Sequence, residues 1–435
     1  NGRAQALADG RVRYTPRADY FGSDSFTYTA ADPSGVRAVG TVTVQVTPVL
    51  DAPTTSTQRF TTLEDVTLSE RLTVTNPDGA ALSFTIVQAP AHGQLTLGND
   101  GVFEYLPSPG FGGADSFSFA VGNAAGEAIG LAELSITPVN DAPVLASGST
   151  LAYTENATSA INTLITVADA DNTTLSTATV SITGGFVSGQ DVLAFTNVPA
   201  TMGNITGSYV AGTGVMTLSS AGNTATLAQW QAALRAVTYN NSSDDPNTGA
   251  RTVSYTVNDS AANSNTVTST VNLTSVNDAP TLTATAASPT FTEGAGSTQA
   301  AAVSVFSGAT TGTVESGQTI TGLTFTVGGL LDGASERIVV DGTTITLGAN
   351  SSGTTTTNGM SYTVTIASGT ATVVLSKVAG VSTGNISTLV NGITYQNTSI
   401  DNPTDGNRVF TLTQIVDSGG TASGGVNTTA LSIAS

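Results

Sequence analysis

The sequence repeats itself, and this feature constrains the fold more than any other. Residues 10–28 (GRVRYTPRADYFGSDSFTY) match residues 101–119 (GVFEYLPSPGFGGADSFSF) at a constant offset, so that Tyr14 corresponds to Tyr105. Self-similarity at a fixed spacing indicates a chain built from similar structural units in series. Residues 1–48 match only the second half of the unit that follows them, so we expect the chain to begin part-way through a repeat.

One recurring phrase joins the repeats. It reads TPVLDAP at residues 47–53, TPVNDAP at 137–143 and TSVNDAP at 274–280. The proline that ends each phrase has no backbone N–H and cannot continue a β-ladder, so each phrase indicates a boundary. The predicted repeats, numbered first to fourth below, are residues 1–48, 49–140, 141–277 and 278–435.

Between these linkers the pattern is that of short strands. Segments such as TVTVQV at residues 41–46 and RTVSYTV at 251–257 alternate with period two and are rich in β-branched residues. Clusters of Gly, Asn and Asp separate them, which favours β-sandwiches over βαβ units. We therefore predict an all-β chain of tandem immunoglobulin-like or cadherin-like β-sandwiches arranged as an extended rod.

Helical spacing occurs once within this strand pattern. Leu227, Trp230, Leu234 and Val237 are three, four and three residues apart, which predicts a short amphipathic helix in the third repeat. The phrase YNNSSDDPNTGAR that follows is matched in the fourth repeat by YQNTSIDNPTDGNR. A second short helix is therefore considered for the fourth repeat.

The composition excludes several classes of protein. The chain carries 31 acidic and 12 basic residues, for a net charge of −19, whereas a nucleic-acid-binding surface must be basic. It has no cysteine, so disulfides and thiolate metal sites lack their residues, and a histidine-based nucleophilic triad would have only His92 to draw on. There is no run of 18 apolar residues, so we expect no membrane insertion in this segment. We predict that the chain is not an enzyme.

The linkers and the strands around them resemble the cadherin-like domains that are repeated many times in giant bacterial adhesins. The resemblance covers essentially the whole chain. It implies an extracellular or cell-surface location and calcium at each domain junction. In that family the ion is bound by a Glu in the first strand of the upstream domain, by the linker Asn-Asp, and by a D-x-D and a later Asp from the downstream domain.

Each junction of this chain matches that pattern to a different degree. The second junction offers Glu64, Asn140, Asp141, Asp169, Asp171 and Asp259. The third offers Glu155, Asn277, Asp278 and Asp417, with Glu315 in place of a D-x-D. The first offers Asp51 and Asp78, because Leu50 replaces the linker Asn and Asn123 stands where the later Asp is expected.

Calcium chemistry agrees with these sets, because the ion takes six to eight oxygen ligands, several of them carboxylates. Acids gathered at one junction would repel each other without a cation. The alternative is that these Asp and Asn residues only form turns, by bonding to their own backbone. Asp115, in the recurring phrase DSF, has the same two interpretations, turn former or metal ligand.

Three functions remain open for such a chain. The first is a calcium-stiffened extension region of an adhesin, which holds a distal tip away from the cell in adhesion or biofilm. The second is a subunit of a filament, sheath or matrix that self-associates, and the third is a glycan-binding module with an unknown surface ligand. Strand complementation by a neighbouring chain would favour the filament. The first repeat bears on this, because half a sandwich should leave Tyr14, Phe26 and Tyr28 less buried than Tyr105, Phe117 and Phe119.

Overall fold

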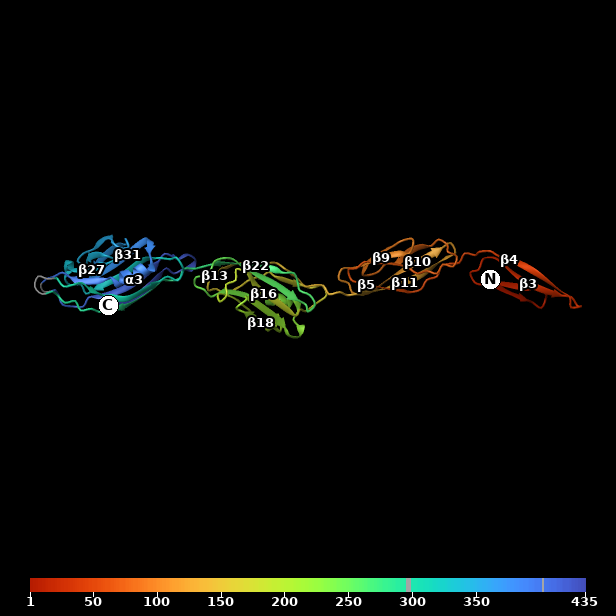
Figure 1. The fold of residues 1–435 in the computed structure, drawn as a ribbon, viewed down its shortest axis with the longest axis horizontal. Coiled ribbons are helices and arrows are strands. Elements are labelled where there is room, and N and C mark those ends of the chain that lie inside the picture. The colour runs from red at the N-terminus through yellow and green to blue at the C-terminus, as the bar shows by residue number, and fades with distance from the viewer. Residues whose placement is uncertain (295–298, 401–402) are drawn as a thin grey trace. The chain divides into compact units, whose positions relative to one another are not determined.

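The structure is a computed structural model that describes residues 1–294, 299–400 and 403–435. These residues form two compact units, residues 1–142 with 169–172, and residues 143–168 with 173–435. The division falls beside the predicted boundary near residue 141. The boundaries near 49 and 278 lie inside the units, and the division into four repeats stays a prediction. Strands dominate both units, so the predicted all-β class is confirmed (Figure 1).

The first repeat consists of two hairpins. Their strands are β1 (Gly2–Ala6), β2 (Val12–Pro16), β3 (Gly22–Ala31) and β4 (Arg37–Val46), paired as β1–β2 and β3–β4. Tyr14 and Phe26 are half-buried and Tyr28 is 47% exposed. Their counterparts Tyr105, Phe117 and Phe119 are at most 1% exposed. This difference in burial agrees with the prediction for a half-sandwich.

The second repeat has two sheets that share one core. One has the order β5-β11-β10-β7 and the other β6-β9-β8. The strands are β5 (Gln58–Leu63), β6 (Leu68–Arg71), β7 (Ser83–Gln88), β8 (Gly93–Leu97), β9 (Val102–Pro107), β10 (Gly113–Asn123) and β11 (Gly126–Thr137). Phe103 of β9 and Phe117 of β10 meet edge to face at 5.1 Å between ring centroids. Alternating inward side chains from both sheets fill the core, as period-two patterning dictates.

The third repeat is a larger sandwich with two helices. Its sheets have the orders β13-β22-β21-β16-β19-β18, β14-β20-β17 and β12-β15. The strands are β12 (Val144–Ala146), β13 (Thr150–Thr154), β14 (Ser159–Ala160), β15 (Thr166–Ala168), β16 (Thr177–Gly184), β17 (Asp191–Ala194), β18 (Ile205–Val210), β19 (Val215–Ser220), β20 (Thr238–Asn241), β21 (Arg251–Asn258) and β22 (Val267–Thr274). The helices are α1 (Pro199–Met202) and α2 (Leu227–Arg235), with a 3₁₀ turn at Ala221–Asn223.

Helix α2 confirms the predicted helical stripe. Thr226 caps it, since its hydroxyl accepts from the Gln229 N–H while the Gln229 side chain accepts from the Thr226 N–H. Trp230, Leu234 and Val237 are fully buried against the sheets. The indole N–H of Trp230 donates to the Leu175 carbonyl at 3.1 Å, so this polar atom is satisfied in the core.

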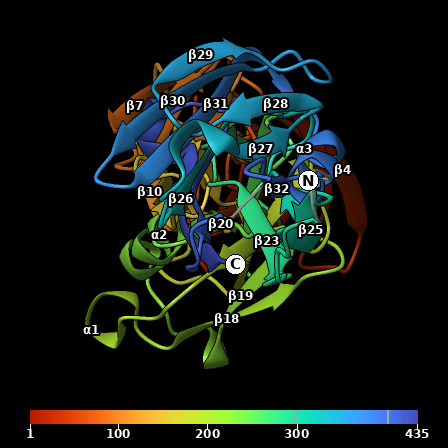
Figure 2. The same ribbon diagram turned by 90° about the vertical axis from the view of Figure 1, so that its left-hand side faces the viewer.

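The fourth repeat follows the same plan with additional strands. Its sheets have the orders β29-β30-β31-β26-β33-β34, β24-β32-β27-β28 and β23-β25. The strands are β23 (Thr281–Ala286), β24 (Val303–Ser304), β25 (Phe306–Gly312), β26 (Ile320–Gly328), β27 (Glu336–Val340), β28 (Thr343–Thr346), β29 (Ser351–Thr354), β30 (Ser361–Ala367), β31 (Thr370–Val381), β32 (Thr394–Asn397), β33 (Val409–Asp417) and β34 (Thr428–Ala434). Figure 2 shows β29, β30 and β31 side by side, and short 3₁₀ turns lie at Gly333–Ser335 and Ala422–Gly424.

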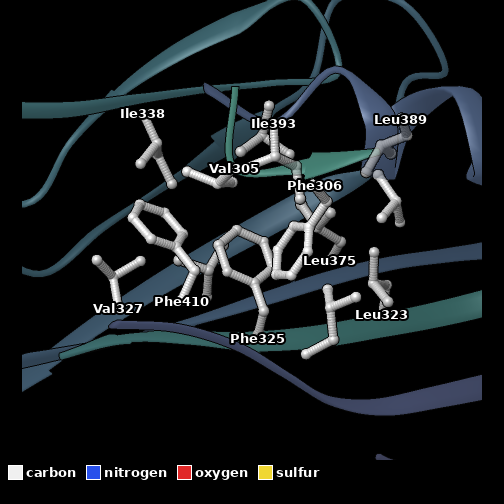
Figure 3. Packing of buried hydrophobic residues seen from close by; sticks show 14 of the residues in the cluster. Val305, Phe306, Leu323, Phe325, Val327, Ile338, Leu375, Leu389, Ile393 and Phe410 are labelled. Atoms are coloured by element: carbon white, nitrogen blue, oxygen red, sulfur yellow. The ribbon is translucent and has the colours of Figure 1, made fainter. Parts of the chain in front are cut away.

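Helix α3 (Thr383–Asn391) confirms the helix considered for the fourth repeat. It precedes β32 just as α2 precedes β20, and it contributes Ile386 and Leu389 to the core. Phe325 and Phe410, from the central strands β26 and β33, point into the same cluster (Figure 3). In the part of the chain that the structure describes, no helix has the length and apolar character needed to span a bilayer.

Candidate metal centre

The centre lies where the third repeat runs into the fourth. Strand β13 pairs in parallel with β22, so that Thr154 lies opposite Thr274 and both strands end together. The Glu155 N–H then donates to the Thr274 carbonyl at 3.1 Å. The Glu155 carboxylate accepts from the Val276 N–H of the linker at 2.7 Å. The end of β13 therefore fixes a buried carboxylate, 6% exposed, against the start of the linker.

Three carboxylates converge at this point. One oxygen each of Glu155, Asp278 and Glu315 lie within 4.8 Å of one another. The Asp278 N–H donates to Glu315 Oε1 at 2.6 Å, which ties the linker to the loop before β26. The remaining oxygens Glu155 Oε2, Asp278 Oδ2 and Glu315 Oε2 are buried without any hydrogen bond. Buried ionised carboxylate oxygens are costly unless they are hydrogen-bonded, paired with a cation or neutralised by a proton.

Burial and mutual repulsion disfavour the ionised forms of these carboxyl groups. Burial raises the pKa of Glu155, and the negative charges of Asp278, Glu315 and Asp244 raise it further. Burial also raises the pKa of Asp278, with a contribution from the charge of Asp244. A carboxyl pKa rises when the ionised form is disfavoured. A bound cation would reverse the repulsion that these groups exert on one another.

The remaining predicted residues of this junction are Asn277, which precedes Asp278 in the linker, and Asp417. The Asn277 side chain donates to Asp417 Oδ1 at 3.2 Å and accepts from the Gln318 amide at 2.6 Å. Asp417 Oδ2 is buried without a partner, and the residue is 2% exposed. The structure thus brings together Glu155, Asp278 and Glu315, and it joins Asn277 to Asp417.

Two residues that the sequence analysis missed also shape this centre. Asp244, from the loop 242–250, is the acid whose charge acts on both Glu155 and Asp278. The sequence feature that could have identified Asp244 is the Asp-Asp pair in the recurring phrase YNNSSDDPNTGAR. Gly419 lies so close to the linker that a Cβ there would be 1.6 Å from Asn277 Oδ1. No sequence pattern distinguishes Gly419 from the other glycines in the same loop.

The second junction repeats part of this geometry. Glu64 is 5% exposed and accepts from the Val139 N–H, which has the same linker position as Val276. The Asp141 N–H donates to Asp171 Oδ2 at 3.2 Å. Asp169 Oδ1 accepts from the Asp171 and Asn172 N–H groups.

Among the carboxylates predicted for the second junction, Asp169 is the one with a buried oxygen that has no hydrogen-bond partner. Its Oδ2 is buried without a partner, and burial raises the pKa of the carboxyl group. The Asn140 side chain donates to the Asp141 carbonyl at 3.0 Å and also contacts Asn172. Asp259 belongs to the other compact unit, where its Oδ1 accepts from the Ala261 and Ala262 N–H groups.

The first junction is held by hydrogen bonds to the backbone of Asp51. The Asp51 N–H donates to Asp78 Oδ2 at 2.6 Å, and the Asn123 amide donates to the Asp51 carbonyl at 2.8 Å. No carboxylate oxygen of Asp51 or Asp78 is among the orphaned buried atoms of the described residues. Asp51 and Asp78 therefore lack the buried carboxylate oxygens without a hydrogen bond that are found at the third junction.

Asp115 accepts four hydrogen bonds. Its donors are the N–H groups of Ala91, His92 and Ser116 and the hydroxyl of Tyr105. Burial alone would raise the pKa of Asp115, but these donors hold it below the ordinary value. The same donors leave its oxygens satisfied, which favours the turn-forming role over that of a metal ligand.

Comparison with known proteins shows a similarity that is confined to the first part of the chain. Residues 1–45 and 50–136 match the bacterial Ig domain family. Halomucin of Haloquadratum walsbyi is 38% identical over 112 residues, which is 25% of this chain and 1% of that protein. The chain thus spans a very small part of this relative.

Solved structures are similar only loosely. The protocadherin fragment PcdhgB3 EC1-4 is 12% identical over 100% of this chain and 90% of its own, with a TM-score of 0.34. The endo-fucoidan hydrolase MfFcnA4 is 16% identical over 63% of this chain and 37% of its own, with a TM-score of 0.21. At such scores, what these proteins do is no guide to this chain. Residues 1–45 and 50–136 are thus similar to bacterial Ig domains, and the described residues of the chain fold into tandem β-sandwiches.

Proposed function

We propose that the chain is a non-enzymatic extension region of a large extracellular surface protein, in which calcium stiffens the junctions between repeats. The observation that carries this proposal is the group Glu155, Asp278 and Glu315, with one buried and unpartnered oxygen on each. Their side chains come from the third repeat, the linker and the fourth repeat. An ion bound by all three would hold the two repeats in one orientation.

The ligand chemistry favours calcium among common protein metals. The neighbouring groups with ligand atoms are carboxylates and amides, from Asp417, Asn277 and Gln318. Oxygen-only sets with several carboxylates suit the hard calcium ion, whereas zinc sites are built mainly from Cys and His. The chain has no cysteine, and its one histidine, His92, stacks on Phe111 in the second repeat.

An extracellular location agrees with the same chemistry. Calcium-binding modules of extracellular proteins bind at dissociation constants of about 10⁻⁴–10⁻³ M, matched to the calcium that is present outside cells. Absence of cysteine leaves metal binding as the available cross-link for a chain of this kind. The match to bacterial Ig domains and the likeness to halomucin support a surface or secreted repeat protein. A role in adhesion or biofilm belongs to this proposal.

The experiment compares melting temperatures of the full chain in calcium and in chelator. Calcium should raise the melting temperature, because it binds the native state only, and at 100 times the dissociation constant this is worth about 2.7 kcal/mol. The double variant Glu155→Gln/Asp278→Asn should lose most of the increment from the third junction. The control Glu70→Gln/Glu104→Gln removes two exposed carboxylates of the second repeat and should keep the increment. Equal melting curves of the natural chain in calcium and chelator would contradict the proposal.

A further inference from the structure

A buried ion pair lies in the core of the third repeat. Arg251 begins β21 and Asp191 begins β17, and they are 1% and 0% exposed. Arg251 Nε donates to Asp191 Oδ2 at 3.1 Å. The Asp191 carboxylate also accepts from the Tyr239 hydroxyl and from the Asn241 amide. A buried ion pair is often no more stabilising than an apolar replacement, so its presence calls for a role other than stability.

Arg251 and Asn241, which both donate to the Asp191 carboxylate, bond to the two ends of the loop 242–250. Arg251 Nη1 donates to the carbonyls of Asn247 and Gly249 at the end of the loop. The Asn241 carboxamide oxygen accepts from the Ser243 N–H at its start. The loop carries Asp244 and Asp245. Their position is therefore set from the core of the repeat.

The loop reaches the metal centre. Asp245 Oδ2 accepts from the Ser316 N–H at 3.0 Å, next to Glu315. The charge of its neighbour Asp244 acts on both Glu155 and Asp278, as described above. The buried pair and the carboxylate cluster are thus connected through nine residues of backbone that carry two acids.

Tyr153 provides a second connection. Its hydroxyl accepts from the Asn241 N–H at 2.8 Å and donates to the Ala157 carbonyl at 2.7 Å. Its ring packs edge to face on Tyr239, with centroids 4.8 Å apart. Since Tyr153 is two residues before Glu155, the same polar network fixes the end of the strand that presents Glu155.

The fourth repeat contains the same network with a different acid. Glu336 faces Asn397 across β27 and β32, as Asp191 faces Asn241 across β17 and β20. Glu336 Oε1 accepts from Arg408 Nε and from the Tyr395 hydroxyl. Arg408 Nη1 donates to the Gly406 carbonyl at 2.8 Å, again at the end of the following loop. The arrangement is therefore a feature of the repeat, and Asp and Glu both serve in it.

We infer that the Arg251–Asp191 pair is a positioning device for the metal centre, which sets calcium affinity by holding the loop 242–250 and the end of β13. The inference rests on the proposed function. Ligands held in place before binding lose less conformational entropy when the ion arrives. Groups that orient metal ligands typically change metal affinity by roughly 10–100-fold when they are removed.

The test is calcium titration of the full chain by calorimetry, with melting temperatures in chelator measured alongside. Arg251→Lys should weaken the affinity of the third junction roughly 10–100-fold. The matched control is Arg408→Lys, which breaks the same network in the fourth repeat, where the described residues form no carboxylate cluster. It should lower the melting temperature in chelator without a change in calcium affinity. Asp191→Glu should keep the affinity, because Glu336 serves at the equivalent position.

Tyr153→Phe provides a test that does not disturb the ion pair. Phe291 packs edge to face on Tyr395 in the fourth repeat, as Tyr153 does on Tyr239, so phenylalanine fits such a site. The variant should fold and should bind calcium more weakly. If Arg251→Lys and Tyr153→Phe bind calcium as tightly as Arg408→Lys, the inference is overturned and the proposed function stands. If the natural chain binds no calcium, both fail.

Discussion

Arg251 pairs with Asp191, sixty residues earlier in the chain, and its Nε lies 3.1 Å from Asp191 Oδ2 with both side chains buried. Asp245 lies only six residues before Arg251 in the sequence. Asp245 instead accepts from the Ser316 N–H at the metal centre. Arg251 therefore lies in the core of the third repeat, whereas Asp245 contacts Ser316, next to Glu315.

The variant Asp191→Ala tests whether Arg251 depends on Asp191 in the core. Removal of one partner of a buried pair leaves an unpaired charge and typically costs about 3–5 kcal/mol. The free energy of unfolding of the third repeat can be followed in urea by the fluorescence of Trp230, the one tryptophan of the chain, which is fully buried there. Asp245→Ala, at an exposed position, should leave this unfolding transition nearly unchanged. Equal losses in the two variants would contradict the assignment.

Gly419→Ala should disturb the linker. Its Cβ would lie 1.6 Å from Asn277 Oδ1, so Asn277 or the backbone of residue 419 must move. We expect a lower melting temperature and a smaller calcium-dependent increment. Gly384→Ala is the control, because it lies in α3 with no atom within 4 Å of the added Cβ. Alanine is the better helix former, so this control should be neutral or stabilising. An unchanged calcium increment in Gly419→Ala would show that Asn277 has no part in binding.

In chelator, stability should fall as the pH rises through the raised pKa values of Glu155 and Asp278. Because folding raises these two pKa values, the folded state binds the protons more tightly than the unfolded state. The resulting stabilisation is complete below the ordinary carboxyl pKa and is lost as the pH increases through the folded values. Melting curves from acid to neutral pH should show this fall, and Glu155→Gln should reduce it. Saturating calcium should remove it, and a pH dependence that is identical with and without calcium would contradict the electrostatic account.

Asp169→Asn should reduce the calcium response of the second junction, since Asp169 Oδ2 is the orphaned oxygen there. Asp115→Asn provides the comparison, because the oxygens of Asp115 are already satisfied by four donors. It should lower the melting temperature equally in calcium and in chelator. A calcium response that disappears in Asp115→Asn and persists in Asp169→Asn would reverse these two roles.

Patterns that are local in the sequence were sufficient to predict much of this structure. The alternation of strands, the stripe from Leu227 to Val237 and the recurring linkers each reflect contacts within a few residues or at a fixed offset. They predicted the all-β class and helix α2, and they selected Glu155, Asp278 and Glu315, which lie together in the structure. The role of these residues as metal ligands stays a prediction.

What the sequence could not predict depends on pairing between distant strands. Asp191 meets Arg251 only because β17 pairs with β20 in a register that places Asp191 opposite Asn241. The charge of Asp244 acts on Glu155 because the loop 242–250 contacts the loop that carries Glu315 through Asp245 and Ser316. Gly419 matters through a contact with Asn277, more than a hundred residues away. Such contacts are set by tertiary packing and have no periodic signature.

Calcium stoichiometry of the full chain, measured by calorimetric titration, tests the central claim most directly. The natural chain should bind calcium, and Glu155→Gln/Asp278→Asn should bind at least one ion fewer while its melting temperature in chelator is kept or raised, because the mutual repulsion of the carboxylates is relieved. The same stoichiometry and affinity in both proteins, or no binding by the natural chain, would contradict the assignment of a calcium site at the junction of the third and fourth repeats.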